Sequence, residues 1–88
     1  MAATVTKYYH GVNEPDPALH AALAQFPEIE FNEIDVSDNP NLVRQLNLRA
    51  LPALIGIGVS GYALTIHGHA HEHALTKFMR DLVTHEDG

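Results

Sequence analysis

The sequence contains no cysteine, few basic residues and no long hydrophobic run. Without a thiol, the chain cannot form a disulfide, attack a substrate with a thiolate or bind zinc through cysteine. Five Lys and Arg residues stand against 11 Asp and Glu residues, which gives a formal net charge of −6. Such a surface repels phosphates, so we expect neither nucleic acid nor an anionic membrane as a partner. No apolar stretch approaches the roughly 20 residues that a membrane helix needs.

The length of 88 residues is enough for one domain, and we expect a single domain over residues 1–88. Hydrophobic residues make up 45% of the chain and charged residues 18%, which is typical of a globular protein. The first ten residues show no basic segment followed by an apolar run, so no secretory signal and a cytoplasmic location are expected. We expect a monomer or a weak dimer.

Strand and helix signals alternate along the chain. Runs of apolar and β-branched residues predict strands over residues 5–9, 29–36, 53–57 and 62–66. Proline and N-cap signals, followed by helical spacing, predict helices over residues 17–26, 40–46 and 71–84. Two consecutive βα units predict parallel neighbours, and the final hairpin adds an antiparallel edge. The order β-α-β-α-β-β-α therefore predicts an α/β fold, a four-stranded mixed sheet with helices on both faces.

Three motifs lie at fixed points of this order. The segment Arg49-Ala50-Leu51-Pro52-Ala53-Leu54 leads into the third strand, Gly68 follows the fourth, and Asp35 ends the second. Together with the element order, they resemble the thioredoxin and glutaredoxin family. The resemblance covers nearly the whole chain and implies the three-layer thioredoxin-like fold. It also implies a cis peptide bond before Pro52 and a glycine, Gly68, that opens the last helix.

The chain departs from the family where the chemistry should be. A Cys-x-x-Cys or Cys-x-x-Ser motif follows the first strand in the family, whereas here Asn13 and Asp16 lie nearest to the two cysteine positions. Thiol–disulfide exchange is therefore excluded, and we do not expect an enzyme. The leading hypothesis is a redox-inactive binding domain for an extended peptide or a protein partner. Its expected binding residues are His10, Asn13, Asp16, Leu51, Pro52 and Gly68.

Four histidines occur at every second position near the end of the chain. They are His67, His69, His71 and His73. Because neutral imidazole is a good ligand for Zn²⁺, Ni²⁺ and Cu²⁺, the first alternative is a metal-binding protein, with zinc or nickel as its cofactor. In that case His10 and Asp16 are candidate further ligands. The simpler interpretation has no metal: His71 packs on the apolar stripe of the last helix, and His67 is half-buried.

Two further hypotheses concern the same end of the sheet. A second alternative is a glutathione-binding protein in which Tyr9 or His10 activates the thiol of the substrate. A helix that begins after Asp16 would attract an anion, but Glu14 and Asp16 already supply negative charge there. Separately, acidification would charge the clustered imidazoles together, so we expect it to loosen the start of the last helix.

Overall fold

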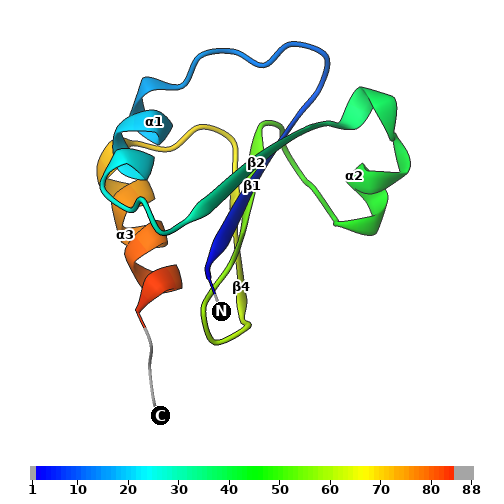
Figure 1. Cartoon of the computed structure of the whole chain (residues 1–88). Coiled ribbons are helices and arrows are strands. Elements are labelled where there is room, and N and C mark those ends of the chain that lie inside the picture. Colours follow the sequence, from blue (N-terminus) through cyan, green and yellow to red (C-terminus); the bar gives the residue numbers. More distant parts are fainter. Residues whose placement is uncertain (1, 85–88) are drawn as a thin grey trace.

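The computed structural model describes residues 2–84 and confirms the predicted order of elements. The strands are β1 (Thr4–Tyr9), β2 (Glu30–Asp35), β3 (Ala53–Ile57) and β4 (Ala63–His67). The helices are α1 (Pro17–Ala24), α2 (Asn41–Gln45) and α3 (Glu72–Val83), with one 3-10 turn, η1 (Val36–Asp38), after β2 (Figure 1). A polar tail over residues 85–88, which the sequence predicts to be frayed, lies outside the described residues. Within residues 2–84, no helix has the length and apolar character needed to cross a membrane.

Local signals account for the start and the end of α1. The Asp16 side chain accepts a hydrogen bond of 3.2 Å from the Leu19 backbone N–H, and Pro17 occupies the first helical position. The helix ends two residues before the predicted Phe26. There the backbone N–H groups of Gln25 and Phe26 bond to carbonyls three residues back, which tightens the last turn.

The sheet is mixed, with the strand order β2-β1-β3-β4. As predicted, β1 and β2 are parallel and β3 and β4 form an antiparallel hairpin. The prediction of a parallel neighbour from the second βα unit is wrong, because β3 runs antiparallel to β1. The connection from β2 to β3, with the five-residue helix α2, begins and ends at the same end of the sheet rather than crossing back along its length. The chain consequently enters β3 at Ala53, which pairs with Tyr8 near the end of β1.

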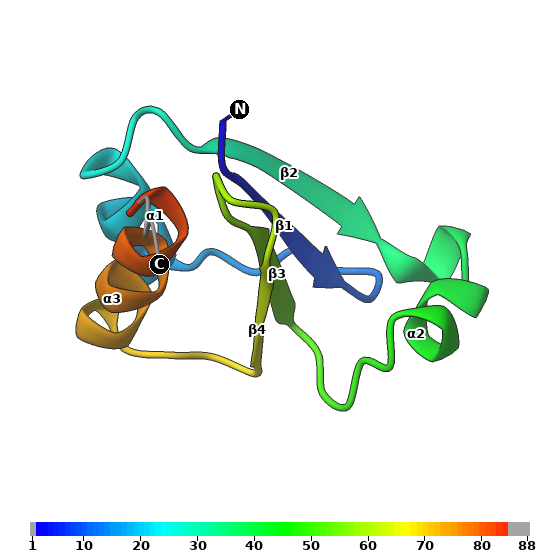
Figure 2. The same cartoon turned by 90° about the horizontal axis from the view of Figure 1, so that it is seen from below.

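Helices cover both faces of the sheet, but unequally. Helices α1 and α3 pack against each other on one face, and α2 lies on the other (Figure 2). The larger core is on the first face; its buried residues are Ala3, Val5, Leu19, Ala22, Ile29, Leu54, Leu75, Phe78, Met79 and Leu82. The smaller core, on the face covered by α2, has the buried residues Tyr8, Val36, Leu48 and Ala53.

The approach of α3 to the sheet depends on a glycine in β3. A Cβ atom at Gly56 would collide with the Leu82 side chain and would lie 2.9 Å from Phe78 Cζ. Glycine therefore lets the helix lie directly on the strand, as expected for a strand glycine that permits close approach.

Candidate functional site

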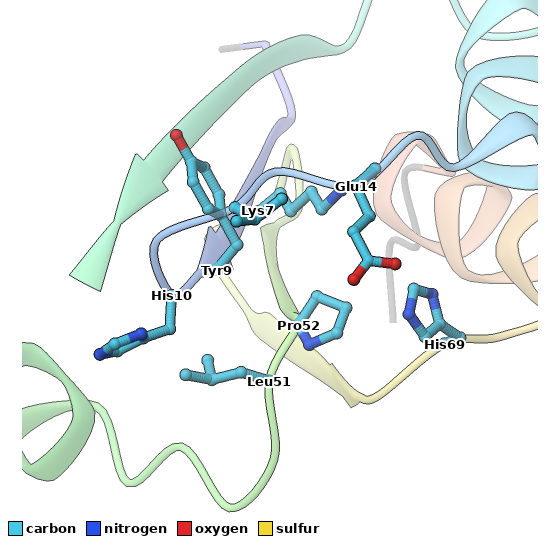
Figure 3. A pocket seen from close by; sticks show the side chains of 8 residues that line it. Lys7, Tyr9, His10, Glu14, Leu51, Pro52 and His69 are labelled. Carbon is cyan, nitrogen blue, oxygen red and sulfur yellow. Dashed lines mark hydrogen bonds between the residues drawn. The ribbon is translucent and has the colours of Figure 1, made fainter. Parts of the chain in front are cut away.

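A cavity of about 230 Å³ opens where β1 ends and β3 begins. The side chains that line it come from β1, from the loop that follows β1, from the segment before β3 and from the segment before α3 (Figure 3). They are Lys7, Tyr9, His10, Val12, Glu14, Leu51, Pro52 and His69. Three of the residues predicted for a binding site, His10, Leu51 and Pro52, are thus brought together.

The Leu51–Pro52 peptide bond is cis. The Pro52 carbonyl accepts a hydrogen bond of 2.7 Å from the backbone N–H of Gly68, which adopts a φ of +80°. This φ lies in the left-handed region that favours glycine, so Gly68 can turn the chain after β4 back toward Pro52. Within residues 2–84, the backbone N–H and C=O of Leu51 have no hydrogen-bond partner.

The loop from His10 to Asp16 is fastened to β2 by side-chain hydrogen bonds. The Gly11 backbone N–H donates to Asp35 Oδ1 at 2.9 Å, and the Asn13 side chain donates to the Glu33 carboxylate. Asp35 Oδ1 also accepts bonds from the backbone N–H and the hydroxyl of Ser37. The bond from Gly11, then those from Ser37, hold the pKa of the Asp35 carboxyl below its ordinary value.

Two of the residues predicted to bind a ligand make contacts within the fold. The Asn13 side chain is hydrogen-bonded to β2 and does not line the cavity. Asp16 caps α1 through Oδ1, and its Oδ2 lies 3.7 Å from His69 Nδ1. Asp16 therefore joins the start of α1 to the segment before α3. Gly68 acts on the site through its backbone, by holding Pro52.

The four alternate histidines do not converge. Among residues 2–84, no group of three or more His, Asp or Glu side chains is arranged to hold a metal ion. His69 lines the cavity, whereas His67, His71 and His73 do not. His67 lies in β4, His71 is the N-cap of α3 and His73 lies inside α3, so the backbone changes conformation between them. The spacing of two therefore does not place the imidazoles on one face.

The interpretation without a metal also needs correction. Both His71, expected to pack on the helix stripe, and His67, expected to be half-buried, are exposed. Zinc or nickel binding by these histidines stays a sequence prediction, as does the loosening of α3 on acidification. A charged His69 would face the Asp16 carboxylate, and this attraction would oppose such loosening.

Two residues of the cavity were missed by sequence reasoning. Lys7 is 4% exposed, and its Nζ donates to the Glu14 backbone carbonyl at 3.2 Å. Val12, in contrast, is 72% exposed. The available signal for Lys7 was a charged residue inside a strand that is covered on both faces. For Val12 it was an apolar residue in an otherwise polar loop.

Comparison with known proteins was informative at the level of structure. No protein-family model matches the sequence, and no curated protein sequence matches it significantly. Mitochondrial thioredoxin 3 from Saccharomyces cerevisiae, in its oxidized form, superposes with a TM-score of 0.73 and 26% identity, over 92% of this chain and 79% of that one. A mutant thioredoxin from Halobacterium salinarum gives a TM-score of 0.75 and 19% identity, over 97% and 78%.

A third thioredoxin, from Trypanosoma brucei brucei, has a TM-score of 0.70 and 24% identity, over 91% of this chain and 74% of that one. The matches thus extend over 91–97% of this chain. The sequence, however, has no cysteine at any position. The chain is therefore a thioredoxin-like domain that lacks cysteine.

Proposed function

We propose that this domain binds an extended peptide segment of a partner protein, alongside Leu51 and over the cavity. The observation that carries the proposal is the free backbone N–H and C=O of Leu51, within residues 2–84, at the edge of that cavity. An extended peptide can satisfy both groups with its own backbone, as in the addition of a strand to a sheet edge. Thiol chemistry plays no part, because the chain has no thiol.

The apolar surface around Leu51 supports a macromolecular ligand. Val12, which is 72% exposed, lines the same cavity as Tyr9, Leu51 and Pro52. It is the most exposed large hydrophobic residue among those that the structure describes. An exposed apolar side chain beside unpaired backbone groups is typical of a recognition surface. A partner can bury the apolar side chain and form hydrogen bonds to the backbone groups.

Selection of linear 12-residue peptides from a random library on the immobilised protein tests the proposal. With a selected peptide, we expect amide chemical shifts to change at Leu51, Ala53 and Gly11 in a spectrum of ¹⁵N-labelled protein. Methylation of single peptide nitrogens should identify one position at which binding is lost, because a methyl group removes the donor to the Leu51 carbonyl. If no peptide is selected, or if the shifts fall elsewhere, the proposal is wrong.

A matched pair of variants tests whether the peptide binds at the cavity. Val12→Ser should weaken peptide binding several-fold, because the partner then buries less apolar surface. Ile57→Ser is the control, since Ile57 is also an exposed large hydrophobic residue but lies at the opposite end of β3. Reduced glutathione, titrated into the wild-type protein, is a second probe. Shifts at Leu51 and Ala53 with glutathione, and none with any peptide, would favour the glutathione-binding alternative.

A further inference from the structure

Lys7 is the one buried charged residue among residues 2–84. Lysine is almost never buried without a partner, because removing an ammonium from water is costly. Within the described residues no carboxylate lies within ion-pair distance of Lys7. Its hydrogen bond goes to a backbone carbonyl, that of Glu14. The fold therefore buries the Lys7 amino group without a carboxylate partner among residues 2–84.

The ammonium has hydrogen-bonding capacity left for a ligand. It carries three N–H donors, and the contacts within residues 2–84 use one of them, toward Glu14 O. The Lys7 side chain lines the cavity together with Tyr9 and Pro52, and it runs toward Glu14 (Figure 3). β1 holds the backbone of Lys7 in the middle of the sheet, between β2 and β3, and the side chain is 4% exposed. The remaining donors are therefore offered to whatever enters the cavity.

The size of the cavity indicates what enters. Its volume of about 230 Å³ is below the range of roughly 300–1,000 Å³ that is typical of small-molecule pockets. A single side chain of a larger ligand fits this size better, with the rest of the ligand lying outside. Leu51, at the rim, is the residue along which that ligand is proposed to run.

Charge around the cavity differs from that of the whole chain. The chain carries a net charge of −6, but the cavity is lined by one lysine, two histidines and one glutamate. The carboxylate of Glu14 points toward Pro52 and His69, away from the Lys7 ammonium (Figure 3). Glu14 is exposed and can move aside, whereas Lys7 is buried.

Resting on the peptide-binding function proposed above, we propose that the cavity accepts an aspartate or glutamate side chain of the bound peptide, whose carboxylate bonds to the Lys7 ammonium. A carboxylate supplies the negative charge and the acceptors that this buried group lacks. The site thus selects acidic peptides at one position, although the protein surface as a whole repels them.

The test is parallel selection of the 12-residue library on three proteins: wild type, Lys7→Met and Lys77→Met. Methionine keeps an unbranched chain of similar length and removes the ammonium. Lys77, the other lysine of the chain, has a side chain that is 73% exposed on α3 and does not line the cavity, so it is the matched control. Peptides from wild type and Lys77→Met should share an Asp or Glu at one position, and peptides from Lys7→Met should not.

Binding of the selected peptides gives the magnitude. Replacement of that acidic residue by its amide should weaken binding to wild type by about tenfold or more, because a hydrogen-bonded charge is lost. The same replacement should change binding to Lys7→Met by less than about twofold. An equal loss with both proteins would overturn the proposal, as would peptides that shift Leu51 without any acidic preference. In both cases the peptide-binding function would stand, whereas failure to select any peptide would overturn both.

Glu14→Gln provides a second variant that does not alter the buried lysine. Its carboxylate lines the same cavity, so its removal should strengthen binding of the acidic peptide several-fold and leave the amide peptide unchanged. Unchanged or weaker binding of the acidic peptide would mean that its carboxylate lies elsewhere, and would overturn the proposal. Because the peptide carries the diagnostic change, this measurement holds even if Lys7→Met does not fold.

Discussion

Helices cover both faces of the sheet, but the two faces differ in how many side chains they bury. On the larger face, α1 and α3 pack on the sheet and on each other, and α3 alone contributes four buried side chains. On the smaller face, α2 has five residues and none of them is buried. Because the larger face holds most of the buried residues, we expect it to supply most of the stability. The loop after β1, at the end of the sheet, is held by side-chain hydrogen bonds to β2. The candidate site lies at this end.

The largest effect should come from Leu82→Ala. Leu82 is fully buried between α3 and β3, so its truncation removes buried apolar surface and leaves a cavity. We expect the free energy of unfolding to fall by about 2–5 kcal/mol. Urea denaturation followed by circular dichroism measures this. A loss below 1 kcal/mol, on the order of a surface substitution, would mean that the two faces do not differ as described.

Gly56→Ala should be the next most severe change, because the added methyl group collides with Leu82. We expect a loss of about 1–3 kcal/mol, again from urea denaturation. The double variant with Leu82→Ala is the control, since the new methyl then occupies vacated space and should cost less. An equal cost of Gly56→Ala in both backgrounds would contradict contact with Leu82 as its cause.

On the smaller face, Val36→Ala should cost less than Leu82→Ala. Val36 is 1% exposed in η1, but the core around it is small and the change removes two methyl groups. We expect a loss of about 1–2 kcal/mol. A loss as large as that of Leu82→Ala, measured under the same conditions, would show that the smaller face contributes equally.

The smallest effect on global unfolding should come from Asp35→Asn, which acts on the loop after β1. The folded-state pKa of Asp35 is lowered, so the anchoring of Gly11 is fully present above the ordinary aspartate pKa, about 4. It is lost as the pH falls through the lower folded-state value. The Gly11 amide shift should therefore move in this acid range in wild type and not in Asp35→Asn. A pH-independent Gly11 shift in the wild-type protein would contradict this.

The parts of the fold that depend on local signals could be predicted from the sequence. The start of α1 follows from Asp16 and Pro17, and the core stripe of α3 from the spacing of Leu75 and Leu82. The direction of β3 could not be derived this way, because it depends on the end of the sheet to which the chain returns after α2. The expected roles of Pro52 and Gly68 came from a family resemblance.

The candidate site was predicted less completely, for a physical reason. The hydrogen bond between the Asn13 and Glu33 side chains joins residues that are 20 positions apart, and no local sequence pattern predicts it. Strand alternation puts Lys7 on the same face as Val5, but its burial depends on the loop that folds over it. The histidine spacing does not place the imidazoles of His67 and His69 on one face, because the backbone turns at Gly68 between them.

Because Lys7 is buried in the cavity, its chemical modification reports how accessible the cavity is. An acylating reagent meets the exposed Lys77 side chain freely, whereas it reaches Lys7 only by entering the cavity that Lys7 lines. The ratio of the Lys7 acylation rate to the Lys77 acylation rate therefore measures how readily a small molecule enters the cavity. With two lysines in the whole chain, that ratio can be followed peptide by peptide in a mass spectrometer, in the unlabelled wild-type protein.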